Sequence, residues 1–100
     1  MAEIIEVDEK KKLCANMAVN MPALRAKAGL SQDELADRLG FSRQTISAIE
    51  NGKRKMQWST FTAIALFFLK DNEISELMSV MGIATDSVKE MFSIEKREFH

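Results

Sequence analysis

Arg43 and Gln44 stand side by side at the start of a short segment, and three cations, Lys53, Arg54 and Lys55, follow its end. Arginine can donate two hydrogen bonds to the O6 and N7 atoms of guanine, and glutamine can pair with the N6 and N7 atoms of adenine. Lysine and arginine bind the phosphate backbone through their positive charge. These residue types point to recognition of a nucleic acid, provided that a helix presents the arginine and the glutamine at an exposed end.

Catalytic and metal chemistry find little support in the sequence. The single cysteine, Cys14, offers no disulfide framework and no thiolate cluster, and we expect it to be a small core residue. The single histidine, His100, is the last residue, which argues against a zinc site. No Ser/His/Asp or Cys/His set and no glycine-rich phosphate loop stands out. We therefore predict a protein that is not an enzyme and that uses no metal or other cofactor.

The charge is distributed unevenly along the chain. The 100 residues carry a formal net charge of -1, which argues against indiscriminate binding of polyanions. Residues 25–55 nevertheless hold seven basic and four acidic side chains, whereas the chain beyond Lys70 is acidic. This asymmetry predicts a polyanion-binding surface confined to one face, although an ordinary solvated helical surface would look similar.

The length predicts one domain over residues 1–100. We expect a helix-turn-helix core over about residues 20–69 and a helical extension over residues 70–100 that could serve dimerisation. Residues 1–12 lack the basic-then-apolar order of a secretory signal, and the apolar run at residues 63–69 is too short to cross a bilayer. We therefore expect a cytoplasmic protein without a membrane segment.

Two short helices are needed to present the arginine–glutamine pair, and the first has a clear start. Ser31 and Glu34 match the S-x-x-E capping box, in which each side chain satisfies a free backbone N–H of the other residue. Gly40 suits the left-handed conformation in which helices often end. We therefore predict a helix over residues 31–39, with the small residue Ala36 where a second helix would cross it.

The second helix is expected over residues 42–51. Ser42 can cap its N-terminus, and Thr45 or Ile46, together with Ile49, would face inward. The tight turn between the two helices predicts a steep crossing, as in a helix-turn-helix. A second helix that projects with its N-terminal end free can place its first residues against base edges in the major groove.

Helical periodicity also covers the rest of the chain. The first helix should begin near Asp8 and end at Gly29, with Pro22 causing either a kink or a fresh start capped by Asn20. Further helices are expected over residues 58–69, 71–82 and 85–92. No segment alternates with period two, so the prediction is an all-α, compact bundle of about five to six helices.

Two of these predictions stay open between alternatives. The helix at residues 58–69 is apolar nearly all round, so it lies either at the centre of the core or under a partner chain. Met78 and Met81 either fill the core or line a dimer interface. For Trp58 we expect packing under the neighbouring loop rather than stacking on a sugar.

The stretch from Leu24 to Lys55 reads LRAKAGLSQDELADRLGFSRQTISAIENGKRK. Its elements GLSQ-x-ELA and G-x-S-x-x-TIS-x-IENG-x-R, taken together, resemble the helix-turn-helix of the lambda-repressor/Cro-like (XRE-type) family, and the similarity extends to about Phe68. The resemblance implies a lambda-repressor-like fold, a compact bundle of about five helices. It also implies binding of operator DNA as a dimer, because members of the family usually bind in that way.

The resemblance implies a role for individual polar residues by their place in the motif. The residues that would contact bases are Arg43, Gln44, Ser47 and Ala48. The residues that would contact phosphates are Gln32, Asn51, Lys53, Arg54 and Lys55. Gln32 would otherwise touch the base at the edge of the half-site, and the small Ser47 and Ala48 would otherwise only let the helix approach closely. Arg25 and Glu50 match a structural ion pair of related domains.

The sequence therefore predicts a sequence-specific DNA-binding transcription regulator, a repressor that binds a two-fold operator on double-stranded DNA as a homodimer. One alternative is an antitoxin that represses its own operon and binds a toxin through the acidic C-terminal part. Another is a protein-interaction module that has lost DNA binding, against which the intact basic cluster argues. The chain departs from the family pattern at Pro22, lacks the usual proline after the basic cluster, and carries no family motif beyond Phe68.

Overall fold

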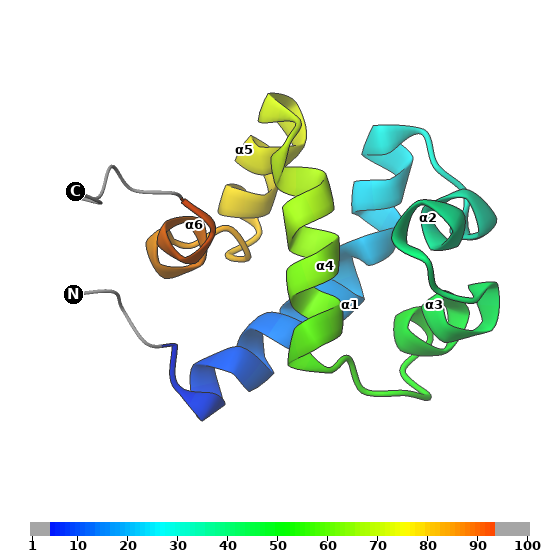
Figure 1. Ribbon diagram of the computed structural model, residues 1–100, viewed down its shortest axis with the longest axis horizontal. Coiled ribbons are helices and arrows are strands. Elements are labelled where there is room, and N and C mark those ends of the chain that lie inside the picture. The colour runs from blue at the N-terminus through cyan, green and yellow to red at the C-terminus, as the bar shows by residue number, and fades with distance from the viewer. Residues whose placement is uncertain (1–4, 94–100) are drawn as a thin grey trace, which may run out of the picture.

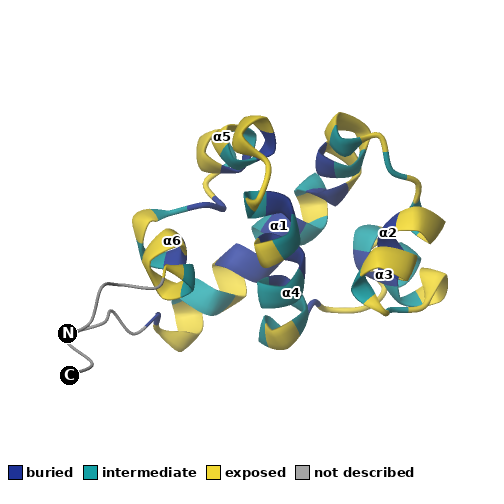
Figure 2. Ribbon diagram, turned by 45° about the horizontal axis from the view of Figure 1, so that its top comes forward, coloured by how far each residue is buried: buried dark blue, intermediate teal, exposed yellow. Residues whose placement is uncertain are grey.

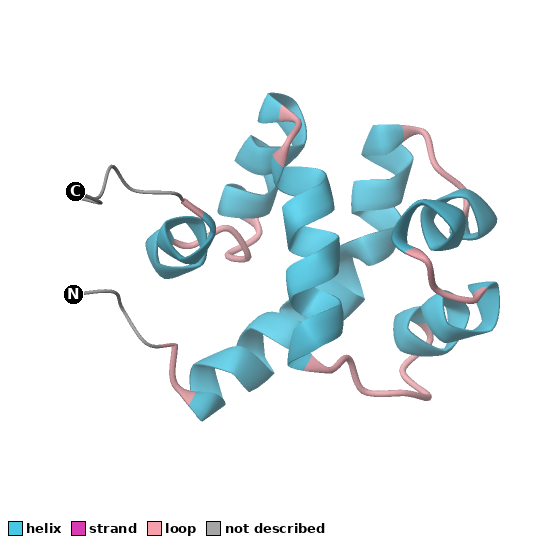
Figure 3. Cartoon of the chain, in the orientation of Figure 1, coloured by secondary structure: helices cyan, strands magenta, loops and turns pink. Residues whose placement is uncertain are grey.

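The computed structural model describes residues 5–93, and within that range the chain forms helices and no strand. The helices are α1 (Val7–Ala28), α2 (Gln32–Leu39), α3 (Arg43–Glu50), α4 (Trp58–Leu69), α5 (Asn72–Val80) and α6 (Asp86–Phe92). In Figure 1, α4 crosses α1 near the middle of the molecule, α2 and α3 lie on one side, and α5 and α6 lie on the other. Figure 3 shows that only short loops connect these helices. The all-α prediction is confirmed.

The first helix is continuous through Pro22, so of the two alternatives at this proline the fresh start capped by Asn20 is wrong. The helix is preceded by Glu6 as its N-cap, which places Asp8 inside the first turn rather than at the cap, and it ends at Gly29 with a φ of 73°. Asn20 instead donates a side-chain hydrogen bond of 2.8 Å to the Asn16 carbonyl. Pro22 is exposed, so its ring lies on the solvent side of the helix.

The helix-turn-helix forms as its caps predict. Ser31 and Glu34 make both hydrogen bonds of the capping box, from Glu34 N–H to Ser31 Oγ (3.0 Å) and from Ser31 N–H to Glu34 Oε1 (2.8 Å). Gly40 ends α2 with a φ of 77°, and the next residue, Phe41, donates its N–H to the Ala36 carbonyl at 2.9 Å. A side chain at Gly40 would be strained in this left-handed conformation, which fixes the turn that leads into α3.

The core runs between α1 and α4 and reaches all six helices. The largest fully buried side chains are Phe61, Phe68, Met17, Met21, Leu24, Leu35, Ile46, Ile64, Met78, Ile83 and Val88. Figure 2 shows this buried strip passing along α1 and α4. Four residues of α4 are buried, so this helix lies at the centre of the core, and Leu66 alone among its large residues is exposed, at 49%.

The C-terminal helices pack on the same core. Ile74 and Met78 of α5 and Val88 of α6 belong to the buried cluster, and the Asn16 side chain donates a hydrogen bond of 2.7 Å to the Met81 carbonyl. Met78 is therefore a core residue and not part of a dimer interface. The predicted extension over residues 70–100 ends in a segment, residues 94–100, that lies outside the described residues. No helix between residues 5 and 93 has the length and apolar character needed to span a membrane.

Candidate nucleic-acid interface

Helix α3 has one buried and one exposed side. Ile46 and Ile49 are almost fully buried, at 0% and 2% exposure, and they attach the helix to α1 and α2. Arg43 and Gln44 are exposed on the opposite side, and Ser47 and Ala48, one turn further along, are half-buried. Because residues four apart lie above one another on a helix, the four predicted base-contacting residues form one continuous strip.

The start of α3 is fixed by its cap. The Ser42 side chain accepts a hydrogen bond from the Thr45 N–H at 3.1 Å, and the two hydroxyl groups lie 2.9 Å apart. Thr45 is half-buried and points along this cap rather than toward solvent. Its hydroxyl also accepts a long hydrogen bond of 3.4 Å from Arg54 Nη1. Thr45 therefore supports the interface and leaves the outer strip to its neighbours.

The loop after α3 is folded tightly back on the helix. The Ala48 carbonyl accepts hydrogen bonds from the N–H groups of both Lys53 (2.9 Å) and Arg54 (3.1 Å), and Asn51 Oδ1 accepts one from the Lys53 N–H at 3.0 Å. Gly52 occupies the left-handed region with a φ of 82°. The backbone of the loop is thereby fixed, while all three cations of the loop remain exposed.

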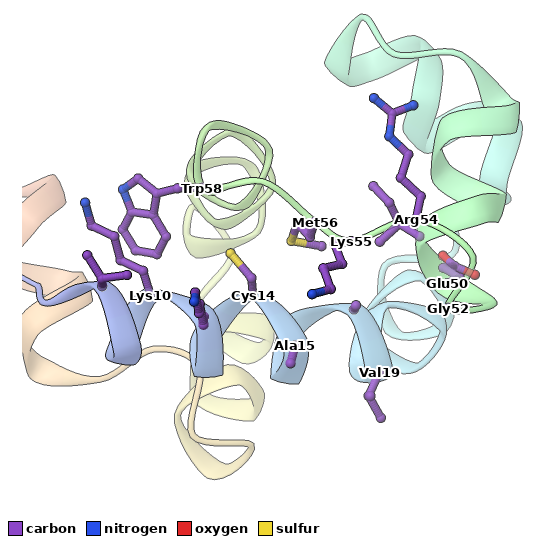
Figure 4. A pocket seen from close by; sticks show the side chains of 14 residues that line it. Lys10, Cys14, Ala15, Val19, Glu50, Gly52, Arg54, Lys55, Met56 and Trp58 are labelled. Carbon is purple, nitrogen blue, oxygen red and sulfur yellow. The ribbon is translucent and has the colours of Figure 1, made fainter.

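The cations of the loop do not all point the same way. Figure 4 shows the Arg54 guanidinium pointing away from α1 and the Lys55 ammonium reaching toward it. Arg54 Nη1 lies 3.4 Å from Thr45 Oγ1, so its guanidinium group lies beside α3. Lys55, like Arg54, also lines a groove over α1.

A single carboxylate joins the ends of three helices. Glu50 Oε2 accepts a hydrogen bond from Arg25 Nε at 2.7 Å, and Glu50 Oε1 accepts from Arg25 Nη2 at 2.9 Å and from Gln32 Nε2 at 3.0 Å. Arg25 also donates to the Leu30 carbonyl at 3.1 Å. The Arg25 and Glu50 side chains are 16% and 7% exposed. The ion pair suggested by the family motif is thus present, and the hydrogen bond to Glu50 raises the pKa of Arg25 further above its ordinary value.

Nothing in the sequence indicated that Gln32 would join this ion pair. Gln32 is half-buried, and one hydrogen of its amide group points at Glu50. The second hydrogen of the same NH₂ group is not used by this contact, so Gln32 can still donate to an external acceptor. Because eighteen residues separate Gln32 from Glu50, only the packing of α2 against α3 could reveal the contact.

Arg43 has an acidic neighbour on α2. Its Nε atom lies 3.6 Å from Asp33 Oδ1, with the two side chains 63% and 74% exposed. An ion pair this open to solvent contributes little to stability, on the order of 0.2–1 kcal/mol. The contact does not bury Arg43, so the guanidinium group remains accessible to a ligand.

Comparisons with known proteins agree with this geometry. A family model described as Helix-turn-helix matches residues 23–68. An uncharacterized HTH-type transcriptional regulator of Methanocaldococcus jannaschii is 50% identical over 44 residues, which are 44% of this chain and 67% of that protein. No solved structure matches the chain. The matched residues contain the whole of α2, α3 and the basic loop.

Proposed function

Because this chain belongs to the lambda-repressor/Cro-like (XRE-type) helix-turn-helix family, we propose that it is a DNA-binding transcription regulator that distinguishes base sequences through α3. The single observation that carries the finer proposal is the exposed start of α3. Arg43 and Gln44 lie there on the side opposite the buried Ile46 and Ile49, so the helix can enter a groove without unpacking.

The base-contacting strip suits the major groove. The groove is wide enough for a helix, and a helix that enters it by its N-terminal end brings its first residues to the base edges. We assign guanine recognition to Arg43 and adenine recognition to Gln44, since these are the bases that match their hydrogen-bonding groups. Ser47 and Ala48 are small and half-buried, so they would meet a thymine methyl group or allow the close approach of the helix.

Phosphate contacts are assigned to the two ends of this strip. Asn51, Lys53, Arg54 and Lys55 are exposed in the loop after α3. At the other end Gln32 has the second hydrogen of its amide group, which can donate to a phosphate oxygen while the first stays on Glu50. Contacts of this kind fix the register of a protein on the duplex and carry no sequence information, so affinity and sequence preference come from different residues.

A homodimer on a two-fold operator is the assembly that we propose. One α3 reads only a few base pairs, whereas two copies related by a two-fold axis read two half-sites on one face of the duplex. A dimer seated on a promoter would act as a repressor by blocking access to it. The exposed apolar side chains Leu66 and Val80, at 49% and 86%, are available to a partner copy.

Selection of bound duplexes from a random pool tests this proposal. We expect a two-fold symmetric consensus that contains guanine and adenine, bound by two copies of the chain. The selected duplex should bind at least about a thousandfold more tightly than a scrambled one at the same salt concentration. Negligible, salt-independent affinity for every duplex would instead identify a protein-interaction module. A second small protein that purifies with the chain and modulates its DNA binding would identify an antitoxin.

A further inference from the structure

A groove of about 620 Å³ lies between the N-terminal half of α1 and the loop after α3. Its apolar lining includes Cys14, Ala18, Met56 and Trp58. Figure 4 shows Cys14 and Met56 facing each other across the groove, with Trp58 at one end. Burial raises the pKa of the Cys14 thiol, so the sulfur is neutral at physiological pH and adds to the apolar surface.

Most of the charged groups around this apolar surface are basic. Lys10, Lys11 and Lys55 line the groove, and the Lys10 ammonium lies 5.3 Å from the centre of the Trp58 ring. The acid that lines it, Glu50, already accepts three hydrogen bonds from Arg25 and Gln32. Within residues 5–93 the ion pairs are Arg25–Glu50, Lys27–Glu73 and Arg43–Asp33, so these lysines have no carboxylate partner there.

We propose that this groove binds a small amphipathic anion, a molecule with an aromatic or aliphatic body and a carboxylate or sulfonate group. The volume is within the range of small-molecule sites, roughly 300–1,000 Å³. The apolar body would cover Cys14, Met56 and Trp58, and the anionic group would lie among the lysine ammonium groups. A neutral apolar molecule of the same shape would also bury apolar surface in the groove, but it would not interact with the lysine charges. The anionic group therefore distinguishes the proposed ligand from other apolar molecules.

The groove shares Lys55 with the basic loop, and this couples the two sites. An anion in the groove holds the Lys55 ammonium toward α1, where Figure 4 already shows it, and so removes one cation from the phosphate backbone. It also adds negative charge beside the loop. A bound anion therefore weakens DNA binding, and by linkage DNA weakens binding of the anion by the same factor. This coupling rests on the proposed function, whereas binding of the anion does not.

Fluorescence titration can test anion binding without DNA. The probe is 8-anilinonaphthalene-1-sulfonate, and the matched neutral probe is N-phenyl-1-naphthylamine, which has the same rings without the sulfonate. Trp58 is the single tryptophan. We expect one sulfonate probe to bind per chain and to quench the Trp58 emission, with the neutral probe binding more weakly.

Three single substitutions locate the site. Lys11→Gln and Lys55→Gln should each lower the affinity for the sulfonate probe by roughly two- to fivefold, the usual contribution of an exposed charge pair. Neither substitution should change the affinity for the neutral probe. Lys89→Gln on α6 removes the same charge from a residue that does not line the groove, and it should change neither. Equal affinity of the two probes, unquenched Trp58 emission, or equal effects of all three substitutions would overturn the proposal.

Two further measurements separate the anion site from its coupling and from other occupants. With DNA present, the probe should weaken binding of the selected duplex, and Lys55→Gln should remove most of that effect. Probe binding with no effect on DNA would overturn the coupling alone, and absence of any DNA binding would overturn the proposed function alone. If probe affinity falls as the chain self-associates at higher concentration, the groove is covered by a second copy and the proposal is wrong.

Discussion

Arg43 and Lys53 are both exposed cations beside α3, yet we propose different tasks for them because their surroundings differ. Arg43 is the first residue of the helix, and its Nε atom lies 3.6 Å from Asp33 Oδ1. Lys53 lies in the loop, where its backbone N–H is bonded to Asn51 and Ala48 and its side chain is exposed. We therefore propose that Arg43 reads the edge of a base and that Lys53 supplies positive charge from a fixed backbone.

Replacing Arg43 with alanine should reduce specificity. Loss of a paired hydrogen bond to guanine costs about 1–3 kcal/mol on the selected duplex and relaxes the preference at one base pair. Competition binding with single-base variants of the selected duplex measures this effect. Lys89→Ala on α6 is the matched control, because it removes a cation from the opposite end of the molecule.

Replacing Lys53 with alanine should weaken binding to all sequences alike. The backbone hydrogen bonds of the loop survive the substitution, so only one phosphate contact is lost. The slope of log affinity against log salt concentration should therefore fall by about one. If Arg43→Ala and Lys53→Ala weakened selected and scrambled duplexes to the same extent, the division of roles between the two residues would be wrong.

At the scale of the elements, Glu50 holds three helices in register. Its removal leaves the Arg25 guanidinium and the Gln32 amide without their acceptor in a site where Glu50 is 7% exposed. We expect Glu50→Ala to lower the free energy of unfolding by about 3 kcal/mol, the lower end of the range for breaking a buried pair, because Arg25 retains some exposure. Urea unfolding checks this value.

The control for Glu50 is Glu76→Ala, which removes an exposed acid from α5. This substitution should change the free energy of unfolding by no more than about 0.5 kcal/mol. Glu50→Gln keeps one acceptor oxygen, so its loss of unfolding free energy should lie between those of Glu50→Ala and Glu76→Ala. A Glu50→Ala chain as stable as the Glu76→Ala chain would show that the shared carboxylate contributes nothing to the fold.

The capping box of α2 should make part of the stability depend on pH. The hydrogen bond from the Ser31 backbone N–H, and then the one with the Ser31 side chain, lower the pKa of Glu34 below its ordinary value. A lowered pKa in the folded state means that the unfolded chain binds the proton more readily, so this contribution is present above the ordinary glutamate pKa and is lost as the pH falls. Urea unfolding of the wild type and Glu34→Gln should therefore differ at about pH 6 and converge near pH 3.

Local signals explain how far the sequence could predict these elements. The caps at Ser31, Ser42, Asp71 and Thr85 each bond a backbone N–H three residues on, so a window of a few residues contains the whole interaction. Pro22 was harder to interpret, because the same proline can break a helix or sit on its exposed side. Which of these occurs depends on how α1 packs against the other helices.

At the scale of the whole molecule, the proposed dimer makes a geometric prediction. Two copies of α3 on one face of the duplex require half-sites with centres about 10 base pairs, or one helical turn, apart. Inserting about five base pairs turns one half-site to the opposite face and should abolish binding by two copies. Gel-shift titration with analytical ultracentrifugation measures both stoichiometry and affinity. Equal affinity for a single half-site, with one chain bound, would rule out the dimer.

Contacts and grooves that join distant segments could not be predicted from the sequence. The resemblance to a known family suggested the Arg25–Glu50 pair, but Gln32 joined it only through the packing of α2 on α3. The groove is made from α1 and a loop some forty residues later, and nothing in either segment alone predicts that their apolar residues face each other under a rim of lysines. Hydrophobic spacing shows which side of a helix is buried, but not what it is buried against.

The buried side of α3 contributes to folding, and its exposed side contributes little. Ile46, Ile49 and Glu50 make the contacts that hold the helix to the body of the protein, while the strip that contains Arg43, Gln44, Ser47 and Ala48 contributes little to the core. Mutations in that strip can therefore accumulate at small cost in folding. Under the proposed function, exchanging a handful of outer side chains would change the preferred operator while leaving the fold intact, which makes the chain a natural starting point for engineered DNA readers.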